Sequence, residues 1–186
     1  MARGVVWFNG LVGLALVTRS GSHTMFKKIL NEFYPDNRQQ ELNITSHDNT
    51  PWHPVKNLSH LYDTRQNAEV LENPIAVLVR DPVERFRSAC ARQNKSVDEA
   101  ITSMNDDVHF WTLESMGLLQ SHLRHFVFPE QLSECAEYLK LSPQIPRLNA
   151  EGEKKKPLLT AYELLKIQKA YDEDIQFYKK LKGERL

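Results

Sequence analysis

Short uninterrupted apolar runs alternate along the chain with segments whose apolar residues recur every three or four positions. The two strongest runs cover residues 11–18 and 75–79. A continuous apolar run of this length is typical of a strand that is covered on both faces. Weaker strand patterns cover residues 41–45 and 125–128. Helical patterns fall between the runs, so the sequence predicts an α/β fold with three layers and a mostly parallel central sheet.

Capping residues and prolines mark the predicted helix boundaries. Apolar residues keep helical spacing from position 26 to position 33, just before Pro35. Asp81 followed by Pro82 is typical of a helix start. Capping boxes are predicted at residues 96–99 and 160–163. After the second box a helical face is predicted to carry Leu164, Gln168, Tyr171, Ile175 and Tyr178.

The length of 186 residues suits one domain, which we expect to span residues 1–186 with a core at about 11–181. The 24 Lys and Arg residues balance 24 Asp and Glu residues. This balance argues against a general nucleic-acid coat but leaves room for a local anion site. The apolar stretch 4–18 is shorter than the roughly 20 residues of a membrane span. We therefore predict a short lead followed by a buried strand, no membrane span, and a soluble, cytoplasmic protein.

The two cysteines, Cys90 and Cys135, are too few for a disulfide framework. Both fall in segments with helical patterns, so we expect buried, reduced thiols.

An anion-binding turn is predicted where the first strong strand ends. Residues 18–24 read Thr-Arg-Ser-Gly-Ser-His-Thr and precede a predicted helix. Gly21 allows close approach of the backbone, and the helix N-terminus favours phosphate or sulfate. Hydroxyl groups supply hydrogen bonds and Arg19 supplies charge. The Walker A pattern is absent, since no lysine follows Gly21 until Lys27.

A second anion site is predicted at the end of the second strong strand. The run 75–79 delivers Arg80 at its carboxyl end, where open α/β sheets bind ligands. Ser88 follows about two turns into the next helix, so Arg80 and Ser88 are placed to hold a phosphate together. We expect Arg85 and Arg87 of the same helix to be solvated.

These two segments together resemble the nucleotide-binding signatures of sulfotransferases that use 3′-phosphoadenosine 5′-phosphosulfate (PAPS). The sequence Arg-Asp-Pro-Val-Glu-Arg-Phe at 80–86, with Ser88 following, is similar to the signature that holds the 3′-phosphate. The turn 19–22 resembles the loop for the 5′-phosphosulfate. The segments 109–111, 126–130, 147–156 and 171–178 resemble the carbohydrate-type branch, so the likeness covers most of residues 11–181.

The resemblance implies a P-loop-like fold, PAPS as the donor and no metal. It also implies transfer of a sulfuryl group by in-line attack to a hydroxyl or amine of an acceptor, with a carbohydrate as the expected class. Arg19 stands where the family often has lysine, and His23 is unusual in that loop. The residues implied in donor binding are Arg19, Ser20, Gly21, Ser22, His23, Thr24, Arg80, Ser88, Lys154, Lys155 and Lys156. The three lysines are expected to form a flap over the 3′-phosphate.

The family places a histidine or glutamate base between its two signatures. His47 follows the predicted strand 41–45 and is our first candidate, with Asp48 beside it. His53 is the second candidate, and Glu41 is a third. Together with Arg19, His47 and His53 form the predicted catalytic set.

Two other functions remain open on the sequence. One is a P-loop-type nucleotide kinase or phosphotransferase, which would require Mg²⁺ and a Walker lysine. The other is a catalytically inactive sulfotransferase-like module that binds a partner. For Trp52, Phe110 and Trp111, packing in the core is favoured over stacking on a ligand.

Overall fold

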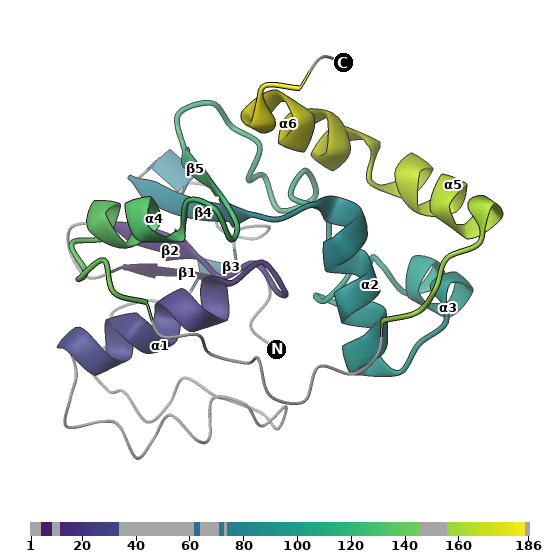
Figure 1. The fold of residues 1–186 in the computed structure, drawn as a ribbon, viewed down its shortest axis with the longest axis horizontal. Helices are drawn as coiled ribbons and strands as arrows, with labels where there is room; N and C mark the ends of the chain where they lie inside the picture. The colour runs from purple at the N-terminus through teal and green to yellow at the C-terminus, as the bar shows by residue number, and fades with distance from the viewer. Residues whose placement is uncertain are drawn as a thin grey trace.

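A mixed five-stranded sheet forms the centre of the molecule (Figure 1). The computed structural model describes residues 5–8, 12–33, 62–63, 71–72, 74–145 and 156–184. Its strands lie in the order β3-β1-β2-β4-β5. Their bounds are β1 Val5–Phe8, β2 Gly13–Ala15, β3 Tyr62–Asp63, β4 Ile75–Val79 and β5 Arg124–Val127.

The sheet confirms the α/β class, and three of its strands are parallel. β2 pairs with β4, and β4 pairs with β5, in parallel register. β1 runs antiparallel to both β2 and β3. The parallel part of the sheet is therefore smaller than predicted, and the apolar stretch 4–18 forms two paired strands where we expected a lead and one strand. The predicted strand at 41–45 lies outside the described residues.

Each face of the parallel strands is covered by different segments. Leu14, Ala76, Leu78 and Phe126 point to the face that packs against α1 (Ser22–Phe33) and α4 (Leu132–Tyr138). The alternate residues of β2 and β4 face the segment 111–123 and α6 (Asp172–Lys182). The continuous apolar runs predicted strands covered on both sides, and the structure confirms this arrangement.

A second core joins the remaining helices. α2 (Pro82–Gln93), α3 (Val97–Thr102) and α5 (Ala161–Ala170) pack around Phe86, Phe110 and Tyr171. The aromatic rings meet at angles, with centroids 5.3 Å apart for Phe86–Phe110 and 5.7 Å apart for Phe86–Tyr171. Phe110 and Trp111 are buried, so the prediction that they belong to the core is confirmed.

Helix starts follow the predicted capping residues. The Asp81 side chain accepts a hydrogen bond from the Glu84 N–H, and Pro82 is the first residue of α2. Both predicted capping boxes are present, at Ser96–Glu99 and at Thr160–Glu163. The face predicted to run from Leu164 to Tyr178 is divided between α5 and α6, because α5 ends at Ala170 and α6 begins at Asp172.

Cys90 and Cys135 are free and buried, as predicted. Burial raises the pKa of each thiol to about 12. Among the described helices, none has the length and apolar character that crossing a membrane requires.

Candidate anion site between two βα corners

The turn between β2 and α1 has an unusual backbone because two of its residues have positive φ. Arg19 has φ of 61° and Gly21 has φ of 86°. A Cβ atom on Gly21 would lie 2.3 Å from two atoms of the Phe128 ring. We expected this glycine to allow a ligand to approach the backbone, but in the structure the Phe128 ring occupies the space where a side chain would lie. Phe128 follows β5, so this contact joins the carboxyl ends of two parallel strands.

The hydroxyl groups of the turn are directed inward. Ser20 and Ser22 both donate hydrogen bonds to the carbonyl of Val17, and both side chains belong to buried residues. Thr24 is also buried. The hydroxyls of Ser20 and Ser22 therefore fix the shape of the turn, and an anion would be met by the N-terminus of α1 and by Arg19. No acidic residue lies in the first turn of α1. The side chain of His23 lies outside the described part of the structure.

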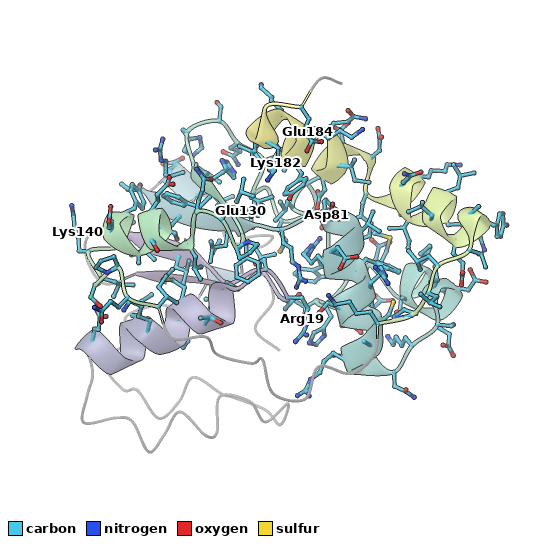
Figure 2. All side chains as sticks on the ribbon, in the orientation of Figure 1. Arg19, Asp81, Glu130, Lys140, Lys182 and Glu184 are labelled. Atoms are coloured by element: carbon cyan, nitrogen blue, oxygen red, sulfur yellow. The ribbon has the colours of Figure 1, made fainter. Side chains whose placement is uncertain are left out.

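The two predicted corners meet through hydrogen bonds made by Arg19 and Arg80. Arg19 Nε donates to Ser88 Oγ at 2.9 Å, and Arg80 Nη1 donates to the Arg19 carbonyl at 3.1 Å. The Arg80 guanidinium carbon lies 5.8 Å from the centre of the Phe128 ring. Figure 2 shows Arg19 where the β2–α1 turn reaches α2, and Asp81 at the N-terminal end of that helix. Arg80 and Ser88 follow Arg19 by 61 and 69 residues in sequence, and the fold brings all three together at one edge of the sheet.

Lys156 reaches the same helix through an acidic residue. Lys156 Nζ lies 3.2 Å from Glu84 Oε2, and Arg87 binds the other oxygen of Glu84. Arg87 Nε also donates to the Pro157 carbonyl at 3.1 Å. Burial would raise the pKa of Glu84, but the hydrogen bonds and charges of Arg87 and Lys156 lower it. The predicted flap residues Lys154 and Lys155 lie outside the described residues.

Arg85 is buried, and our expectation that it is solvated was wrong. Its Nη2 donates to the Trp111 carbonyl at 2.7 Å and to Asp174 Oδ2 at 3.3 Å. Asp174 also accepts hydrogen bonds from the N–H groups of Leu113 and Glu114. Arg85 Nη1 has no hydrogen-bond partner within the described residues. Because Asp174 is 89 residues away, the local sequence around Arg85 carries no sign of the pair.

The predicted bases His47, His53 and Glu41 lie outside the described residues, as does Trp52. The structure also describes His109, which belongs to the segment 109–111 that resembles the carbohydrate-type branch. His109 Nδ1 lies 2.8 Å from Asp107 Oδ1, and Lys95 Nζ lies 3.0 Å from Asp107 Oδ2. The carboxylate two residues before the histidine was the available sequence signal.

No family model, curated protein or solved structure matches this chain. Within the described residues, no three His, Cys, Asp or Glu side chains gather in a way that suits a metal ion. The chemistry of the site depends on its own groups. Those groups are two guanidinium side chains, a buried serine and a helix N-terminus whose first turn has no acidic residue, which together suit a polyanionic ligand.

Proposed function

We propose that this protein is a PAPS-dependent sulfotransferase that transfers a sulfuryl group to a hydroxyl or amine of an acceptor, with a carbohydrate as the expected class. The observation that carries the proposal is the junction of the two corners. Arg80 binds the backbone of Arg19, and Arg19 binds the side chain of Ser88. The resemblance assigns these residues to opposite ends of one donor, which requires the corners to be neighbours.

The electrostatics of the junction favour a donor with several negative charges. Arg19 and Arg80 bring two charges that persist at any physiological pH. Asp81 is engaged as the N-cap of α2, and Glu84 is engaged by Arg87 and Lys156. Among the described residues, Asp81 and Glu84 thus have hydrogen-bond partners other than the Arg19 and Arg80 guanidinium groups.

In the proposed reaction the protein aligns the two substrates and stabilises charge. An acceptor oxygen or nitrogen attacks sulfur, and the 5′-phosphate of adenosine 3′,5′-bisphosphate leaves with the electron pair of the broken bond. Charge that develops on the leaving oxygen is stabilised best by donors held in place beforehand. The α1 N-terminus and Arg19 are fixed in this way by the inward hydrogen bonds of the turn.

The test is binding of adenosine 3′,5′-bisphosphate to the wild-type protein and to Arg80→Ala, measured by titration calorimetry. A hydrogen bond between charged groups is worth about 1.5–3 kcal/mol, so the Kd is expected to rise roughly 10- to 150-fold. Arg92→Ala is the matched control, because Arg92 is an exposed residue in the last turn of the same helix. We expect its Kd to stay within about twofold of wild type.

A transfer assay completes the test. Wild-type protein is mixed with labelled PAPS and a panel of sugars, phenols and amines, and labelled product is measured with and without EDTA. Transfer that is insensitive to EDTA supports the proposal. Mg²⁺-dependent binding of ATP without binding of the bisphosphate would indicate a phosphotransferase. Bisphosphate binding without transfer to any acceptor or to water would indicate an inactive module.

A further inference from the structure

The turn after β5 places Phe128 beside the end of β4. The Phe128 N–H donates a hydrogen bond to the carbonyl of Val79, the last residue of β4, at 2.8 Å. Gln131 closes the turn, because its side chain accepts from the Val127 N–H at 2.8 Å and its N–H donates to the Val127 carbonyl at 2.7 Å. The main chain of Phe128 is therefore fixed next to the strand end from which Arg80 follows.

The Phe128 ring lies against both corners of the candidate anion site. At the first corner it fills the space beside Gly21, where a Cβ atom would lie 2.3 Å from Cδ2 and Cε2 of the ring. At the second corner the Arg80 guanidinium carbon lies 5.8 Å from the ring centre. Phe128 is half-buried and packs against the core between the sheet and α1. One aromatic side chain thus connects the carboxyl ends of three parallel strands, β2, β4 and β5.

Arg80 is held by groups that carry no charge. Within the described residues it donates one hydrogen bond, to the Arg19 carbonyl at 3.1 Å, and forms no ion pair. Arg85 and Arg87, the next two arginines along the chain, each pair with a carboxylate. A guanidinium carries five N–H donors, and the described part of the chain uses one of those of Arg80.

An aromatic ring suits this position better than a carboxylate would. Both groups attract a guanidinium, but a carboxylate would compete with the phosphate of a ligand for the same N–H donors. The ring attracts the cation through the negative potential of its face and leaves those donors to a ligand. A side chain that is already held in place also loses less conformational freedom when the ligand binds.

We propose that Phe128 is the positioning residue of Arg80 and holds its guanidinium ready for a phosphate of the donor. This inference rests on the proposed function. Phe128 acts through Arg80 and takes no part in the transfer step. Removing the ring should therefore weaken donor binding only while the Arg80 guanidinium is present.

The first test is a double-mutant cycle in which the Kd for adenosine 3′,5′-bisphosphate is measured by titration calorimetry. Phe128→Leu and Phe128→Met both remove the ring and keep apolar volume, and we expect each to raise the Kd roughly 2- to 10-fold. In an Arg80→Ala background the same changes should alter the Kd by less than about twofold. Phe128→Tyr keeps the ring face and should stay within about twofold of wild type.

The matched control is Phe126→Leu, two residues earlier in the same strand. Phe126 is buried, and the Arg124 guanidinium carbon lies 5.7 Å from the centre of its ring. This variant loses an aromatic ring beside an arginine outside the candidate site. We expect it to lower the Tm at least as much as Phe128→Leu does and to leave the Kd within about twofold of wild type.

The second test needs no ligand. Nitrogen-15 relaxation at Arg80 Nε should report a rigid group in wild type and in Phe126→Leu, and a more mobile one in Phe128→Leu. Unchanged mobility of Arg80 in Phe128→Leu overturns the inference. So does an equal rise in Kd with and without the Arg80 guanidinium, or an equal rise in Phe126→Leu. These results leave the proposed function standing, whereas wild-type protein that does not bind the bisphosphate overturns the proposed function together with this role of Phe128.

Discussion

Removing the Arg85 guanidinium tests whether the buried ion pair holds the C-terminal helices to the rest of the domain. The Arg85 and Asp174 side chains are 3 % and 0 % exposed. Arg85→Met keeps most of the apolar length of the side chain but leaves Asp174 with hydrogen bonds from Leu113 and Glu114 only. The perturbation therefore isolates the loss of a charge partner from the loss of volume.

The expected loss of unfolding free energy depends on the contacts that Arg85 and Asp174 make in the wild-type protein. Removing one member of a buried ion pair typically costs 3–5 kcal/mol. Arg85 Nη1 has no partner among the described residues, and removing a buried unsatisfied group recovers part of that cost. We expect a loss of about 3 kcal/mol, which corresponds to a Tm lower by roughly 6–12 °C for a domain of this size.

Thermal unfolding followed by circular dichroism measures this loss, with Arg87→Met as the control. Arg87 is on the same helix, but its side chain is 23 % exposed and its ion pair with Glu84 is near the surface. A pair of that kind contributes about 0–1 kcal/mol. Burial raises the pKa of Asp174 in the wild-type protein, so the carboxyl of Arg85→Met should take up a proton readily and the penalty should shrink toward pH 5. Equal losses for the two variants at pH 7 would refute the reasoning.

Two further predictions concern stability. Gly21→Ala combines a positive φ with a Cβ at 2.3 Å from the Phe128 ring, so urea unfolding should show a loss of about 2–5 kcal/mol in stability. Gly183→Ala also has a positive φ but nothing within 4 Å of its Cβ, so its loss of stability should be only about 1–2 kcal/mol. Similar losses for the two variants would contradict the close contact. Burial lowers the pKa of His125, so the unfolded chain takes up a proton at a higher pH than the folded protein. Stability should therefore fall as the pH drops below about 6.5, and this fall should be smaller in His125→Gln. Tm values measured between pH 7.5 and pH 5 test this prediction. Parallel curves of Tm against pH for the two proteins would contradict it.

The sequence predicts an element well where local and tertiary preferences agree. β4 has the bounds of its apolar run, and α2 begins at the Asp81–Pro82 pair, because a buried strand and a capped helix each carry their own signal. β5 is displaced by one residue from the predicted run 125–128. The strands within residues 4–18 were harder to predict, because two short apolar strands close together in sequence form one apolar run. The Asn9-Gly10 pair within it was a hairpin signal, and the antiparallel pairing of β1 with β2 agrees with that signal.

The candidate site was predictable only as far as its residues were local to a strand end. Arg80 and the turn 18–24 follow directly from the rule that ligands gather at the carboxyl ends of parallel strands. The burial of Arg85 depends on Asp174, 89 residues away, and the position of His109 depends on Thr18, 91 residues away. No pattern within a single helix or strand encodes such contacts. The inward hydroxyls of Ser20 and Ser22 also depend on the final turn geometry, which residue type alone leaves undetermined.

The contacts of α2 link the stability of the domain to the geometry of the candidate site. Within this helix, Ser88 meets Arg19 of the first corner, and Arg85 meets Asp174 of α6 and the carbonyl of Trp111. The segment that carries His109 is thus fixed by the same helix that carries the second corner. If α2 shifted relative to the sheet, Ser88 would move away from Arg19 and the Trp111 carbonyl would lose its donor at the same time. The buried ion pair therefore acts on the segment that carries His109 and on the proposed donor site through one helix, which is a reason for a charge to be buried here although apolar residues would pack as stably.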